Sequence, residues 1–79
     1  MKWEYQEHSQ SEYTYTPHYQ CWVIKRYDNS FLVSIARFDD GTHDLEFLVD
    51  DKETAMKLAE KNLIWCEETD ILWKEFKNE

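Results

Sequence analysis

The sequence predicts an α+β domain in which one amphipathic helix packs on one face of a small antiparallel sheet. Two observations predict this class. Short segments rich in β-branched and aromatic residues stand between turn sequences, and one longer segment carries apolar residues at helical spacing. The expected order is β-β-β-β-α-β, which gives a two-layer fold. The 79 residues suffice for one domain with a small core, and a 16% share of aromatic residues adds large rings to it.

The N-terminal residues 1–12 are polar apart from two aromatic rings, which is typical of a flexible arm or of an edge strand. We expect the domain proper to span residues 13–79. Residues 13–16 alternate Tyr with Thr, two good strand formers, and Pro17 ends this first strand.

Residues 20–27 and 31–38 predict two longer strands. Between them, Asp28 and Asn29 favour a turn because both residue types tolerate left-handed backbone angles. The second of these strands is largely apolar on both faces. We therefore expect it in the middle of the sheet.

A further strand is expected from about Thr42 to Val49, after a hairpin turn at Asp39, Asp40 and Gly41. Apolar and polar residues alternate along it, so alternate side chains should face the core and the solvent. The expected core-facing residues are Leu45, Phe47 and Val49, and the expected solvent-facing residues are Asp44, Glu46 and Leu48.

A helix is expected to start at Asp50, because Asp50 as N-cap and Glu53 three residues later have the spacing of a capping box. It should continue to about Trp65. Apolar residues recur on one face of this segment, among them Ala55, Leu58, Ala59, Leu63 and Cys66. The charged residues of the opposite face are best explained by solvation.

Residues 71–76 fit two structures, after a link at residues 67–70. As a strand, Ile71 and Trp73 share one face; as a short helix, Leu72, Trp73 and Phe76 cluster. A sheet with one helix usually gains from a closing strand, so we expect a strand here.

Negative charge is concentrated between Asp39 and Asp51, a stretch with six acids and no Lys or Arg in a chain of net charge −8. Clustered phosphates would repel such a chain, so bare nucleic acid and anionic lipid are unfavourable ligands. Basic protein surfaces attract it. A second explanation needs no ligand: acids favour solubility, make turns, cap helices and protect sheet edges.

The candidate binding residues are therefore carboxylates at a turn, along a strand and at a helix start, with tyrosines that can serve as interface anchors. They are Asp39, Asp40, Asp44, Glu46, Asp50, Asp51, Tyr13 and Tyr15.

No pattern in the sequence predicts an enzyme, a metal site or a cofactor. His18 and Cys21 have the spacing of metal ligands, but a structural zinc site normally needs a second close pair. Cys66 lies near the expected helix C-terminus, where the dipole disfavours a thiolate nucleophile. Starting from Asp39, the acidic stretch also lacks the ligand pattern of a calcium loop.

Cys21 and Cys66 are expected to be buried free thiols, which suits a reducing cytosol. The sequence shows no signal peptide and no long apolar run, so we expect a cytoplasmic protein without a membrane partner.

In length, charge and expected architecture, the whole chain resembles the small acidic inhibitors that phages and mobile elements carry against bacterial defence, such as anti-CRISPR proteins. The resemblance rests on no shared motif, so it assigns no functional residue. It implies an inhibitor or adaptor that docks on a basic, nucleic-acid-handling protein, with carboxylates in the place of phosphates. The alternative is a structural module that forms a homodimer by pairing strands across a two-fold axis, through the strand near Tyr13 or the last strand.

Overall fold

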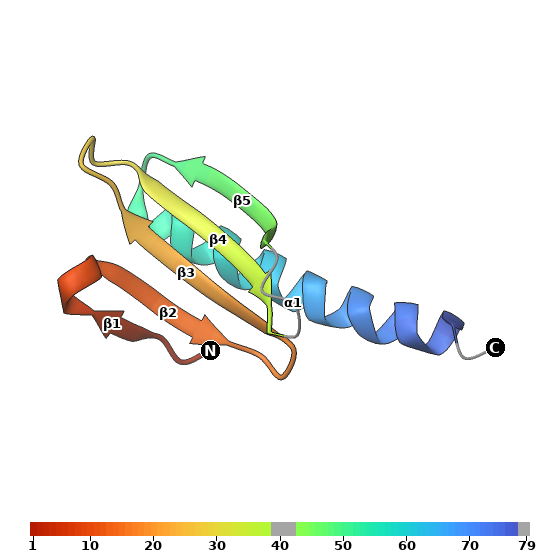
Figure 1. The fold of residues 1–79 in the computed structure, drawn as a ribbon. Coiled ribbons are helices and arrows are strands. Elements are labelled where there is room, and N and C mark those ends of the chain that lie inside the picture. The colour runs from red at the N-terminus through yellow and green to blue at the C-terminus, as the bar shows by residue number, and fades with distance from the viewer. Residues whose placement is uncertain (39–42, 78–79) are drawn as a thin grey trace.

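The computed structural model describes residues 1–38 and 43–77 of the chain. This part forms one five-stranded antiparallel sheet in the order β1-β2-β3-β4-β5, with a single long helix on one face (Figure 1). The elements are β1 (Glu4–Gln6), the 3-10 helix η1 (Glu7–Ser9), β2 (Ser11–Tyr15), β3 (Tyr19–Lys25), β4 (Phe31–Arg37), β5 (His43–Val49) and α1 (Lys52–Lys77).

The predicted fold class is confirmed: the domain is α+β, with one helix packed on an antiparallel sheet. The four predicted strands are followed by the helix in the expected order. The predicted turn after β3 is also present. Asn29 has a φ of 69°, and Asp28 accepts hydrogen bonds from the amide and the hydroxyl of Ser30 at 3.0 and 2.6 Å.

The prediction of a closing strand at residues 71–76 is wrong, because α1 continues without a break to Lys77. The expected link at residues 67–70 contains no Gly or Pro to stop the helix. Glu67 and Glu68 are good helix formers, so the helix can continue through this segment as one helix of 26 residues, about 39 Å long. The C-terminal turns of α1 extend past the end of the sheet (Figure 1).

The remaining strand of the sheet comes from the other end of the chain. Of the two alternatives for residues 1–12, the structure has an edge strand at β1. Side-chain hydrogen bonds hold this segment in place: the Trp3 indole donates to Glu60 on α1 at 2.8 Å, and the Thr14 hydroxyl donates to the Lys2 carbonyl at 2.6 Å. β1 covers the edge of β2 from Ser11 to Tyr13, so this part of β2 is paired on both sides.

The helix start is displaced by one residue from the predicted position. Asp51, rather than Asp50, is the N-cap, since its Oδ2 accepts hydrogen bonds from the amide and the hydroxyl of Thr54 at 2.9 and 3.0 Å. These two bonds lower the pKa of the Asp51 carboxyl, the bond from the amide most.

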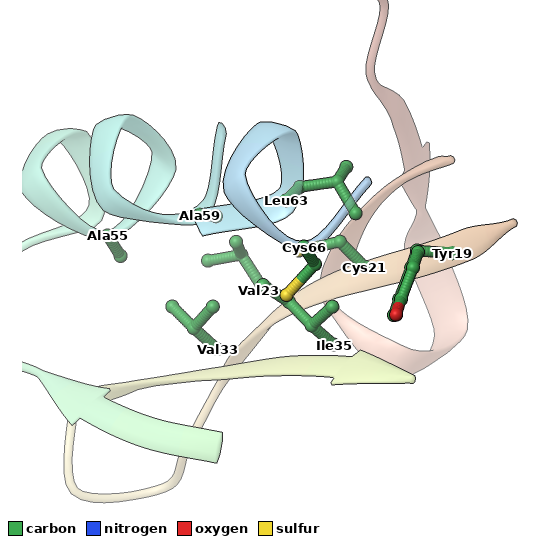
Figure 2. Packing of buried hydrophobic residues seen from close by; sticks show 9 residues of the cluster. All are labelled: Tyr19, Cys21, Val23, Val33, Ile35, Ala55, Ala59, Leu63 and Cys66. Carbon is green, nitrogen blue, oxygen red and sulfur yellow. The ribbon is translucent and has the colours of Figure 1, made fainter. Parts of the chain in front are cut away.

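The core lies between α1 and the two central strands β3 and β4 (Figure 2). Ala55 and Ala59 let the helix approach the sheet closely, and Leu63 fills the space beyond them. The predicted alternation of β5 is confirmed for its inward residues, which pack partly buried against this core. The buried cluster is Tyr19, Cys21, Val23, Val33, Ile35, Ala55, Ala59, Leu63 and Cys66, with Leu45, Phe47 and Val49 packed against it.

Among the described residues, no helix has both the length and the apolar character needed to cross a membrane.

Candidate binding face

The side of the sheet opposite α1 is open. In the segments 1–38 and 43–77, α1 is the one α-helix, and it covers the other side (Figure 1). The strand register lines up one residue from each strand across this open side. The pairs run from Glu4 to Tyr13, from Tyr13 to Trp22, from Trp22 to Ser34 and from Ser34 to Glu46. The row therefore has a carboxylate at each end, about 19 Å apart at normal strand spacing.

Aromatic rings gather in and beside this row. The Tyr13 ring lies 5.5 Å from Trp22 and 6.2 Å from Tyr15, and Tyr15 lies 6.4 Å from Phe38, all measured between ring centroids. Such spacings are those of favourable ring pairs. The Tyr15 side chain is 64% exposed, so it remains available for contact. We call Glu4, Tyr13, Trp22, Ser34 and Glu46, with Tyr15 and Phe38, the aromatic face.

Tyr13 stays a neutral hydrogen-bonding group in this setting. Burial, and then the fields of Tyr15 and Glu4, raise the pKa of its phenol. The hydroxyl donates a hydrogen bond to the Gln20 side chain at 3.3 Å. The centre of the face is thus uncharged, and its fixed negative charge lies at the two edges.

The structure brings together three of the eight predicted binding residues: Tyr13, Tyr15 and Glu46 share the aromatic face. Asp44 lies at an irregularity of β5, where the register skips from the pair Ile35–Leu45 to the pair Ala36–His43. Asp50 is exposed at the end of β5 and Asp51 caps the helix, so they lie outside the row. Asp39 and Asp40 fall outside the described residues.

The other members of the face were not among the eight predicted binding residues: Glu4, Trp22, Ser34 and Phe38. The pairing register joins the strand residues, since it places Glu4 beside Tyr13 and Tyr13 beside Trp22, and a ring contact with Tyr15 joins Phe38. A sequence pattern within one strand carries no such information.

A second polar cluster ties the turn between β2 and β3 to α1. The partly buried Glu67 carboxylate accepts hydrogen bonds from the Thr16 hydroxyl at 2.7 Å and from the His18 amide at 3.2 Å. The other carboxylate oxygen lies 2.5 Å from Nδ1 of His18. An ionised carboxylate can only accept, so Nδ1 carries the proton of this bond. His18 is therefore part of a structural clamp, and no cluster of three metal-ligand side chains occurs in the described residues.

Cys21 and Cys66 are both buried thiols, as predicted. Burial, and to a smaller extent the field of Cys66, raise the pKa of the Cys21 thiol to about 12. A thiol with this pKa is protonated near neutral pH, so Cys21 is a core side chain rather than a nucleophile.

The Glu67 clamp should make stability depend on pH. Burial alone would raise the pKa of the Glu67 carboxyl, but the bonds from His18 and Thr16 outweigh it and hold the pKa below its ordinary value of 4.5. The ionised carboxylate therefore stabilises the fold above about pH 4.5, and this contribution disappears as the pH falls through the lower, folded-state pKa. Glu67→Gln should reduce the free energy of unfolding at pH 7 by about 1 kcal/mol.

Urea denaturation from pH 7 down to pH 3 checks this prediction. The difference between Glu67→Gln and the unchanged protein should shrink as the solution becomes acidic. Glu53→Gln is the matched control, because Glu53 is exposed and forms a surface pair with Lys57 at 3.4 Å. A difference that is constant over the whole pH range would show that the ionised clamp does not exist.

Comparisons of this chain with protein-family models, with curated proteins and with solved structures find no match.

Proposed function

We propose that this protein is a non-enzymatic binding protein, an inhibitor or adaptor that docks its aromatic face on a basic surface of a nucleic-acid-handling protein. The observation that supports this most is the row across the sheet, in which Tyr13 and Trp22 stand between the carboxylates of Glu4 and Glu46. Tyr and Trp are the residues most often found as anchors at the centre of protein interfaces.

The charge of the face supports a basic partner. The row from Glu4 to Glu46 carries two carboxylates and no Lys or Arg, and Lys2, which precedes β1, lies beside its Glu4 end. Glu4 and Glu46 would attract and orient a basic surface, while the rings between them supply most of the contact energy. Because carboxylates carry the same sign of charge as phosphates, the protein would compete with nucleic acid for its partner.

The test uses two variants of equal net charge. Glu4→Gln with Glu46→Gln removes two charges from the aromatic face, and Glu53→Gln with Glu68→Gln removes two exposed charges from α1. The tagged protein captures its partner from nuclease-treated lysate of the source cell, and the affinity for the purified partner is then measured at several salt concentrations.

The face variant should bind about tenfold more weakly and show a smaller dependence on salt, whereas the helix variant should bind almost like the unchanged protein. Tyr15→Ser should also weaken binding, with little change in its salt dependence. An equal loss of affinity in both charge variants would show that only the net charge of the protein matters, which contradicts the proposal. Unchanged binding of the face variant would also refute it.

A further inference from the structure

The sheet has two edges of very different length. At one end lies the short β1, with three residues, and at the other lies β5, with seven. Within the described segments, β5 pairs with β4 along one side, and no strand pairs with its other side. An edge strand of this length presents alternate N–H and C=O groups that can pair with an added strand.

A groove runs between this edge and the helix. It has a volume of about 500 Å³, and its lining residues are Leu45, Leu58, Lys61, Asn62 and Trp65. The Trp65 side chain is 61% exposed and that of Leu58 is 37% exposed, although both are large apolar groups. A strand added to β5 would place every second side chain beneath these two residues, because side chains alternate across a strand.

We propose that β5 receives an extended segment of the basic partner as a sixth strand, with apolar residues toward the groove and Lys or Arg on the opposite side. This inference rests on the proposed function, and it specifies that the positive charge of the partner lies on an extended segment that pairs with β5. On the aromatic side of β5, Glu46 is exposed at the end of the charged row. A basic residue next to Glu46 would extend that row by one favourable cross-strand pair.

The charges of the groove agree with this orientation. Lys61 lines the helix side, where it would repel a basic side chain and tolerate an apolar one. The inward residues of β5 are apolar and half-buried, namely Leu45, Phe47 and Val49, and an added strand would continue this layer. The two sides of β5 therefore favour an added strand in which apolar and basic residues alternate.

A second copy of this chain fits the edge less well. Antiparallel pairing of β5 with its copy around Glu46 would place the two Glu46 residues opposite each other. Pairing around Phe47 would place Asp44 opposite Asp50. Either register sets like charges in close pairs between chains that each carry a net charge of −8, which is destabilising. The charge of the edge therefore favours a basic segment.

In the experiment, a synthetic peptide of nine residues in which Lys and Val alternate is added to the isotope-labelled protein. NMR spectra recorded during this titration report the binding. The amides of β5 should shift, and their exchange with solvent should slow, because they gain hydrogen-bond partners. Methyl groups on alternate backbone nitrogens of the peptide should weaken binding at least about tenfold, because they remove its N–H donors. A peptide with Glu in place of Lys should not bind.

Variants locate the contact. Trp65→Ser should weaken peptide binding several-fold, while Ile64→Ser, at the neighbouring exposed position, should leave it unchanged. Shifts confined to Tyr13, Tyr15 and Trp22 would overturn strand addition and leave the proposed function intact.

Three further results would overturn the inference: no saturable binding at all, equal binding of the Glu peptide, or protection of β5 that depends on protein concentration without any peptide. The last result would identify a second copy as the occupant of the edge. The proposed function is tested separately, by the affinity of the aromatic-face variants for the captured partner.

Discussion

Replacing Arg37 with Met is expected to lower the free energy of unfolding by about 3–5 kcal/mol. The Arg37 guanidinium lies 2.8 Å from Oδ1 of Asp70, whose side chain is 2% exposed. The same guanidinium stacks 5.6 Å from the Tyr19 ring centroid, and the Tyr19 hydroxyl lies 3.5 Å from Asp70. The substitution removes a cation that contacts a buried carboxylate, and such a loss approaches the whole stability of a domain of 79 residues, about 4–12 kcal/mol.

Urea denaturation at pH 7 measures this effect. Lys57→Met is the matched control, because it makes the same kind of substitution in an exposed pair with Glu53 on the helix surface, where the change should be close to zero. The double variant Arg37→Met with Asp70→Leu should recover most of the lost stability, since it removes both charges and leaves apolar groups of similar size. A single variant as stable as the control would mean that the ion pair does not hold α1 to β4.

This ion pair also shows why the end of the helix was not predicted. Residues 67–70 contain two glutamates and an aspartate, a composition typical of a solvent-exposed link, and Ile71 to Phe76 fit a strand and a helix equally well. The contact of Asp70 with Arg37 joins residues far apart in the sequence, so it leaves no local pattern. Such tertiary contacts decide between the two structures for a short apolar segment.

The strands were predicted well where the signal is local. The alternation of Leu45, Phe47 and Val49 and the turn at Asp28 depend on neighbouring residues and on turn chemistry. β1 has a weak local signal, because its three residues are mostly polar and exposed. It is a strand because β2 offers it an edge, and that edge is a property of the folded sheet.

The candidate site was predicted in part for the same reason. The side of the sheet on which Glu46 and Tyr13 lie can be predicted, because alternation of side chains along a strand is a local property. Their alignment through Trp22 and Ser34 depends on the register of four strands. The structure places Asp51 at the N-cap of the helix, outside the row that contains Glu46. A run of acids in sequence is therefore a poor guide to a common surface.

Leu63→Ala is expected to lower the free energy of unfolding by about 3 kcal/mol. Leu63 is fully buried in the layer between α1 and the sheet, where it is one of the largest such side chains (Figure 2). Its neighbours on the buried face, Ala55 and Ala59, already hold the helix close to β3 and β4, so the helix cannot move inward to fill the space. The substitution should leave a cavity, and the cost of this cavity adds to the stabilisation lost with the buried apolar atoms.

Ile64→Ala is the control for this prediction, because it removes a side chain of equal size from the next residue of the same helix, which is 46% exposed. Both variants carry Ala at the changed position, and Leu and Ile differ in helix propensity by only a few tenths of a kcal/mol, so most of the difference between their free energies of unfolding reports burial against the sheet. Thermal or urea denaturation should show a large loss for Leu63→Ala and a small change for Ile64→Ala. Equal effects of the two substitutions would mean that α1 packs on the sheet with another face, and both the groove beside β5 and the open aromatic face would then have to be placed anew.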